Sequence, residues 1–157
     1  MVSNNLTPGF RITTNQDEFD LYSVLSFLES SYWAKGITLE RLSKAVENSL
    51  CFGVISPQGR QVGFARVISD KSTFAYLSDV YILQEYRGFG LSKLLLMNIF
   101  RHKDLQGLRR FMLSTLDAQG LYSKFGFTDL KEPKIHMEKS LLELEILNAN
   151  ESCSADL

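Results

Sequence analysis

The residue types best suited to chemistry lie in one glycine-rich turn, Gln84-Glu85-Tyr86-Arg87-Gly88-Phe89-Gly90-Leu91-Ser92-Lys93. This turn joins a predicted strand to a predicted helix. Glycines at positions 88 and 90 let the backbone turn sharply and come close to a ligand. The first N–H groups of the following helix have no partner inside it and carry partial positive charge. Together with the Arg87 cation, they are suited to bind a pyrophosphate.

Two other phosphate-binding motifs do not fit this turn. Gly88-Phe89-Gly90 continues with Leu91-Ser92-Lys93, so the third glycine of a dinucleotide-binding fingerprint is missing. No Gly-Lys-Ser/Thr follows, which excludes a P-loop. A turn of this composition also occurs without any ligand, so a purely structural role is the alternative.

A second candidate is Asp79, the only carboxylate inside the strand that precedes the turn. A carboxylate at a buried position requires a partner or a role. Asp79 is therefore a candidate catalytic residue. A hydrogen-bonded structural aspartate explains it equally well.

Other reactive side chains form no recognisable pattern. His102 and His136 fit neither a catalytic triad nor the spacing of metal ligands, and Cys51 and Cys153 form no spaced pair. We therefore expect neither a metal site nor an activated nucleophile.

The apolar periodicity predicts the elements that position these residues. Helical spacing predicts helices from Asp17, as N-cap, to about Gly36, and at Leu39–Asn48, Gly90–His102 and Ala118–Phe125. Extended runs predict strands at Phe10–Thr14, Leu50–Ser56, Gln61–Ser69, Phe74–Leu83, Phe111–Leu116, Phe127–Leu130 and His136–Lys139.

This order of elements indicates an α/β fold. Residues 50–83 read as an antiparallel meander, and the strand-helix-strand unit that follows makes one strand pair parallel. We expect a single domain over residues 1–157, with a core at about 10–139 and a polar, disordered tail at about 148–157.

The composition of the chain limits the classes of partner that we expect. The net charge of −1 gives no basic field, so no nucleic acid is expected. No apolar run approaches the roughly 18 residues of a membrane span, so no membrane partner is expected either. The absent secretory signal and the low cysteine content favour the cytoplasm.

The glycine turn and its strand resemble a known motif. Asp79-Val80-Tyr81-Ile82, followed by the turn to Leu91, resembles the acetyl-CoA-binding motif of the GNAT (GCN5-related) N-acetyltransferases. Downstream, Leu121-Tyr122-Ser123-Lys124-Phe125-Gly126-Phe127 resembles their second signature. The likeness covers about residues 10–139. The sequence departs from the family pattern in two places. Read from Arg87, the motif has Ser92 in place of a Gly or Ala; read from Glu85, both glycines fit but the leading residue is acidic. Asp117 stands where many members carry Asn.

The resemblance implies the GNAT fold, a single mixed and mostly antiparallel sheet flanked by helices, with a bulged central strand splayed from its parallel neighbour. It implies direct acetyl transfer from acetyl-CoA to an amine in a ternary complex. The alternative is a non-catalytic acyl-CoA-binding sensor or interaction module on the same fold. The cofactor-binding residues implied are Val80, Tyr81, Ile82, Arg87, Gly88, Phe89, Gly90, Leu91, Ser92 and Lys93.

The resemblance also suggests roles on the acceptor side. Asp79 would act as a base, directly or through water, or would attract a cationic amine. Tyr122 would donate a proton to the leaving thiolate, the alternative being a tyrosine that only packs. Polyamine-acetylating relatives carry Glu where Ser78 stands here, and Tyr32 and Trp33 would line the acceptor wall. A small amine, an antibiotic, an amino acid or a protein N-terminus all remain open as acceptor, and the protein is expected to be a monomer or a homodimer.

Overall fold

The computed structural model describes residues 8–141 and divides the chain into two compact units, one up to Ser114 and one from Thr115. Each unit is described here by itself. The first contains the whole sheet and the helices of its two faces. The second contains a short helix and two single turns of 3-10 helix.

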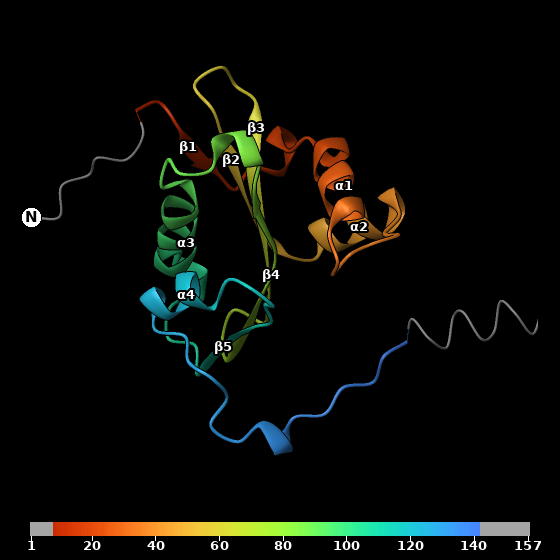
Figure 1. Ribbon diagram of the computed structural model, residues 1–157, viewed down its shortest axis with the longest axis vertical. Helices are drawn as coiled ribbons and strands as arrows, with labels where there is room; N and C mark the ends of the chain where they lie inside the picture. Colours follow the sequence, from red (N-terminus) through yellow and green to blue (C-terminus); the bar gives the residue numbers. More distant parts are fainter. Residues whose placement is uncertain (1–7, 142–157) are drawn as a thin grey trace, which may run out of the picture. The chain divides into compact units, whose positions relative to one another are not determined.

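The sheet of the first unit is mixed and has five strands in the order β1-β2-β3-β4-β5 (Figure 1). The first four strands are antiparallel neighbours, whereas β4 and β5 are parallel. The predicted meander and parallel pair are both confirmed. The strands are β1 Arg11–Thr13, β2 Leu50–Ile55, β3 Gln61–Ser69, β4 Phe74–Ile82 and β5 Arg110–Leu113.

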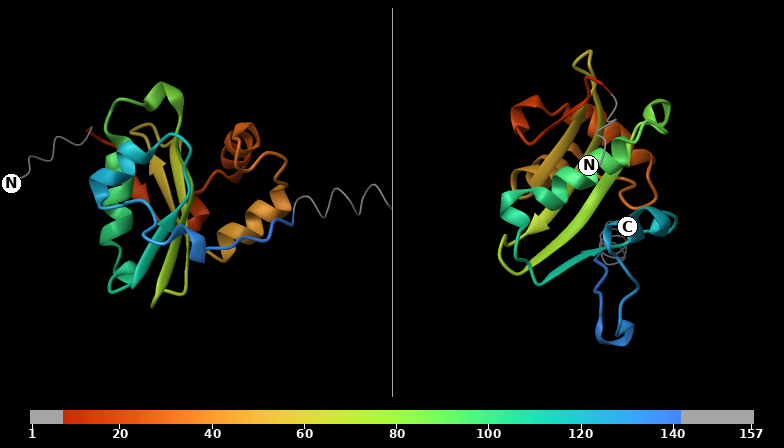
Figure 2. Two further views of the ribbon diagram at one scale, coloured as in Figure 1. Left: turned by 60° about the horizontal axis from the view of Figure 1, so that its bottom comes forward. Right: turned by 90° about the vertical axis from the view of Figure 1, so that its left-hand side faces the viewer.

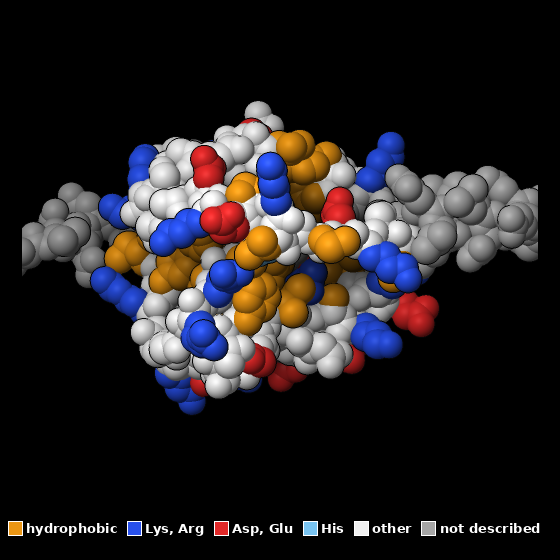
Figure 3. Space-filling model, turned by 90° about the horizontal axis from the view of Figure 1, so that it is seen from below, with side chains coloured by type: hydrophobic (Ala, Val, Ile, Leu, Met, Phe, Trp, Pro, Cys, Tyr) orange, Lys and Arg blue, Asp and Glu red, His pale blue; other side chains and the backbone are white. Residues whose placement is uncertain are grey.

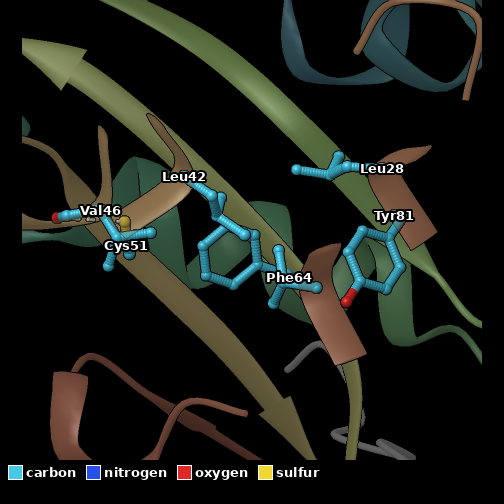
Figure 4. Packing of buried hydrophobic residues seen from close by; sticks show 7 residues of the cluster. Leu28, Leu42, Val46, Cys51, Phe64 and Tyr81 are labelled. Atoms are coloured by element: carbon cyan, nitrogen blue, oxygen red, sulfur yellow. Dashed lines mark hydrogen bonds between the residues drawn. The ribbon is translucent and has the colours of Figure 1, made fainter. Parts of the chain in front are cut away.

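Helices cover both faces of this sheet (Figure 2). Helix α3 lies on one face, and α1 and α2 lie on the other. Their bounds are α1 Leu21–Ser30, α2 Leu39–Glu47 and α3 Leu91–Arg101. Under α1 and α2, a buried cluster joins the helices to the strands (Figure 4): Val24, Leu28, Leu42, Val46, Cys51, Phe64 and Tyr81.

The first helix begins later and ends earlier than predicted. Its N-cap is Asp20 rather than Asp17: the Asp20 carboxylate accepts from the Ser23 N–H at 3.1 Å, while Asp17 lies in a 3-10 turn. The helix ends at Ser30 instead of near Gly36. The next residue, Ser31, has extended backbone, and its hydroxyl donates to the Leu28 carbonyl at 2.7 Å. These side-chain bonds favour turn geometry over further helix.

Strand β4 carries a bulge at its centre. Phe64 pairs with Tyr81, but Arg66 pairs with Ser78, so β4 has one more residue than β3 between these pairs. Within the bulge Asp79 has a φ of +54°. On the other edge of β4, pairing with β5 ends at Leu77 and Leu113. The bulge and the early end of the parallel pairing match what the resemblance implied.

Next to the bulge, β3 and β4 approach closely at Gly63. A Cβ there would lie 2.5 Å from Ile82 Cδ1, 2.9 Å from the Tyr81 carbonyl oxygen and 3.0 Å from Val54 Cγ2. The backbone oxygen cannot move aside without shifting the strand. A glycine is therefore required at position 63 for the observed spacing.

We expect Gly63→Ala to lower the free energy of unfolding by about 1–3 kcal/mol, the usual cost of overpacking a tight interior. Urea unfolding followed by circular dichroism measures it. Gly120→Ala is the matched control, because a Cβ at Gly120 meets nothing within 4 Å and the position is helical. Equal stability of the two variants would contradict the close-approach argument.

The second unit contains α4 Gln119–Tyr122, continued by a 3-10 turn at Ser123–Phe125. Gly126 ends it with a φ of +88°, as predicted for the residue that follows the helix. The strands predicted at Phe127–Leu130 and His136–Lys139 are wrong: no strand is assigned among residues 115–141. The hydrogen bonds around Pro133 are local, from Ile135 N to Glu132 O and from His136 N to Pro133 O. The expected tail at 148–157 lies outside the described residues.

Candidate functional site

The glycine turn forms an open helix N-terminus. Gly88 and Gly90 have φ values of +84° and +74°, and Gly90 is the N-cap of α3. No side chain caps the first N–H groups of this helix. A Cβ at either glycine would meet nothing within 4 Å, so there is free space beside the backbone. An anion can therefore approach these N–H groups directly.

Residues 85–87 of the turn contact the end of β4 and Arg60 between β2 and β3. The Arg87 Nε donates to the Ile82 carbonyl at 3.1 Å, which fixes the guanidinium beside the end of β4. The Glu85 carboxylate lies 3.5 Å from Arg60 Nη1, and the Arg60 guanidinium lies 5.8 Å from the centre of the Tyr86 ring. These contacts join the turn to the β2–β3 hairpin, so the site is positioned by the sheet.

The residues predicted to contact the pantetheine arm follow the bulge directly. Val80, Tyr81 and Ile82 lie in β4 beyond its last pair with β5. The Tyr81 ring stacks on Phe27 with centres 3.8 Å apart, and burial raises the pKa of its hydroxyl, so the hydroxyl stays protonated at neutral pH. The side chain of Tyr81 thus belongs to the buried cluster under α1 and α2, and the predicted contact of its backbone with the pantetheine arm stays a prediction.

Asp79 has two partners in this structure. Its Oδ2 accepts from Arg66 Nε at 2.7 Å, and its Oδ1 accepts from Trp33 Nε1 at 3.2 Å. Only 6% of the Asp79 side chain and 15% of the Arg66 side chain are exposed. Arg66 also donates from Nη1 to the Ser49 hydroxyl at 3.3 Å. The buried charge is thus paired and hydrogen-bonded, as burial requires.

Exposed aromatic rings lie beside this ion pair. Trp33 is 42% exposed and Tyr32 is 57% exposed, and their rings meet edge to face at 5.0 Å. Phe27 lies 6.4 Å from the Trp33 ring. Ser78 pairs with Arg66 across the sheet. The structure therefore brings Trp33, Asp79 and the bulge together.

Tyr122 belongs to the second unit, at the end of α4. The residue is 8% exposed, and its ring lies 6.0 Å from that of Phe127. Tyr122 is therefore packed against its neighbours. This agrees both with a proton donor and with a tyrosine that only packs. Its role beside the cofactor stays a prediction.

Arg66, the ion-pair partner of Asp79, was not predicted from the sequence. It lies in β3, where the five residues before it are buried. The signal was present, because an arginine inside an apolar strand needs a buried acceptor and Asp79 is the carboxylate of the next strand. Their pairing depends on the register across the bulge, which the sequence does not reveal.

Residues 8–141 lack the features that a reactive thiol, a metal site or a membrane-spanning helix requires. Burial raises the pKa of the Cys51 thiol to about 12, so this thiol is protonated and unreactive at neutral pH. No group of three or more His, Cys, Asp or Glu in this part of the chain is placed to hold a metal ion. Likewise, none of its helices is both long and apolar enough to cross a membrane. Basic and acidic side chains are interspersed on the face seen in Figure 3.

Known proteins resemble this chain in sequence and in fold. Residues 47–129 match the model of the acetyltransferase (GNAT) domain. A candidate acetyltransferase of Gibberella zeae is 34% identical in an alignment 122 residues long, which covers 64% of this chain and 68% of that protein. An uncharacterized N-acetyltransferase of Pyropia yezoensis is 29% identical over 130 residues, covering 76% and 70% of the two chains.

A solved structure adds to these likenesses. It is the crystal structure of a candidate acetyltransferase of the GNAT family from Xanthomonas campestris pv. campestris, 47% identical to this chain. It superposes with a TM-score of 0.82 over 85% of this chain and 94% of that one. The domain match spans more than half of the 157 residues and includes β4, the glycine turn and α3. This chain belongs to the GNAT acetyltransferase family.

Proposed function

We propose that the protein is an N-acetyltransferase that transfers the acetyl group of acetyl-CoA to an amine. One observation carries the proposal: an uncapped helix N-terminus with two positive-φ glycines directly follows a bulged strand that has lost its parallel partner. The helix end suits a pyrophosphate, and the unpaired strand edge suits an extended chain that carries amides.

In this proposal each part of the first unit holds one part of acetyl-CoA. The N–H groups of Leu91, Ser92 and Lys93 bind the pyrophosphate, together with the Arg87 cation. The backbone of residues 80–82 pairs with the amides of the pantetheine arm. A backbone N–H at the bulge donates to the thioester oxygen, where negative charge develops during attack. Nothing in this assignment depends on a covalent intermediate.

The reaction forms one C–N bond and breaks one C–S bond. The attacking amine must be neutral, although a free alkylamine has a pKa of about 10.4, so a base or a desolvating site must remove its proton. The departing thiolate takes up a proton. Tyr122 is the proposed donor, because a phenol with a pKa of about 10 is protonated at neutral pH. Asp79 is a candidate base only if its carboxylate can reach the amine.

The remaining features of the function are proposals of the same kind. A small amine or a peptide N-terminus is the proposed acceptor, and the cytoplasm is the proposed location. We propose that the two units together form a single acetyltransferase domain, active as a monomer or a homodimer.

Acetyl-CoA should stabilise the protein. At 100 times its dissociation constant it should add about 2.7 kcal/mol to the free energy of unfolding. For a domain of this size, the melting temperature should then rise by roughly 5–11 °C. Differential scanning fluorimetry with acetyl-CoA tests this, with pantetheine as the control that lacks the pyrophosphate.

An unchanged melting temperature at millimolar acetyl-CoA would contradict the proposal. Binding is not yet catalysis, so a panel of amines should also be screened for release of free CoA. Binding without release across the panel would favour the non-catalytic sensor.

A further inference from the structure

Asp79 joins four segments of the first unit through hydrogen bonds. The carboxylate itself lies in the bulge of β4 and accepts from Arg66 of β3 and from Trp33 of the α1–α2 connection. Arg66 reaches Ser49, just before β2. Each oxygen of the carboxylate already accepts one hydrogen bond, and 6% of the side chain is exposed. Little of it is left to contact an incoming amine.

The backbone conformation of Asp79 is unusual for a residue other than glycine. Asp79 and Lys71 are the two non-glycine residues with positive φ in the part of the chain that the structure describes. Glycine adopts this conformation without steric cost, and glycine is the usual residue at such a position in a bulge. The bulge geometry alone would thus favour glycine at position 79, and aspartate tolerates this geometry while adding the hydrogen bonds to Arg66 and Trp33.

Trp33 is the exposed partner of Asp79. Its N–H donates to Asp79, while 42% of the residue is exposed beside Tyr32 and Phe27. Arg66 balances the charge of Asp79 and orients its carboxylate. The anchored N–H fixes the orientation of the exposed indole ring.

We propose that Arg66 and Asp79 are positioning residues that hold Trp33 against the bulge of β4, and that Trp33 contacts the acceptor. Asp79 is then not the general base of the reaction. The part of this inference that concerns the acceptor rests on the proposed acetyltransferase function. The part that concerns the docking of Trp33 does not.

The chain supplies a direct probe, because Trp33 is its single tryptophan. Asp79→Gly removes the carboxylate and suits the positive φ, so the bulge is retained while the Trp33 bond is lost. A hydrogen bond to a charged group is removed, so the ratio of released to docked indole should rise roughly tenfold or more. Emission should shift to longer wavelength, and quenching by acrylamide should increase.

Lys71→Gly is the matched control, since it relieves the other positive φ, in the turn before β4, and leaves Asp79, Arg66, Trp33 and Ser49 unchanged. It should keep wild-type emission and quenching. If Asp79→Gly fails to fold because Arg66 is left unpaired, Asp79→Gly combined with Arg66→Met removes both charges and should show the same release. Wild-type emission and quenching in a folded Asp79→Gly or double variant would overturn the proposal.

Kinetics with any amine from the screen then separates positioning from proton transfer. Asp79→Gly and Trp33→Phe should both raise the KM of the acceptor and leave the KM of acetyl-CoA unchanged. Both variants should also keep the acidic limb of the pH profile, which is the fall of kcat/KM at low pH as the general base is protonated. Loss of that limb in Asp79→Gly, with a fall in kcat of about 10²–10⁴-fold, would make Asp79 the base and overturn the proposal. A protein without any turnover would refute the acetyltransferase function, while the fluorescence experiment still decides whether Asp79 positions Trp33.

Discussion

Tyr122→Phe should lower kcat by roughly 10²–10⁴-fold, the usual contribution of a positioned general acid. The substitution removes one oxygen and keeps the ring, so the packing of Tyr122 against Phe127 should change little. The KM of acetyl-CoA should stay near its wild-type value, because the proposed contacts to the phosphates and the pantetheine come from Arg87 and from backbone groups, and none comes from the Tyr122 hydroxyl. Steady-state kinetics with a working acceptor measures both constants.

Tyr22→Phe is the matched control, because Tyr22 is 73% exposed and no role is proposed for it. It should keep wild-type kcat. If Tyr122→Phe keeps more than about a third of wild-type kcat with chemistry shown to limit the rate, Tyr122 is not the acid. The alternative of a tyrosine that only packs would then be correct.

Gly90→Val should abolish acetyl-CoA binding in a protein that still folds. The φ of +74° at Gly90 is unfavourable for a β-branched residue, and the valine side chain would occupy the free space through which the pyrophosphate approaches α3. Both effects act at the binding site, so the dissociation constant should rise beyond the range of calorimetry.

Gly59→Val controls for backbone strain. Gly59 also has a positive φ, +80°, and open space beside it, but it lies in the turn between β2 and β3. The two variants should lose similar stability, and Gly59→Val alone should retain wild-type affinity for acetyl-CoA. Unchanged affinity in Gly90→Val would show that the glycine turn is purely structural.

Local sequence signals predicted the framework of the site well. Periodicity located β2, β3, β4 and α3 to within one or two residues, because each has a long apolar pattern and a turn or glycine at its end. The glycines of the α3 turn predicted an open helix N-terminus. This feature depends on φ angles and terminal N–H groups, which are properties of a short segment.

The sequence predicted the N-cap of α1 and the strands of the second unit less reliably. The predicted N-cap of α1, Asp17, is wrong, because the carboxylate of Asp20 accepts the Ser23 N–H and makes Asp20 the N-cap. The strands predicted in the second unit had suitable composition, yet a strand forms only beside another strand. No such neighbour is assigned among residues 115–141.

The sequence alone determined the family, the parallel β4–β5 pair and the type of ligand that the glycine turn suits, since these follow from contiguous residues. Only the tertiary structure decided which partners Asp79 has. Arg66 and Trp33 are 13 and 46 residues away along the chain, and the β4 bulge and the α1–α2 connection bring them to the carboxylate. The register between strands and the position of a loop depend on packing across the whole unit. The partners of a buried charge therefore cannot be predicted from the residues next to it in the sequence.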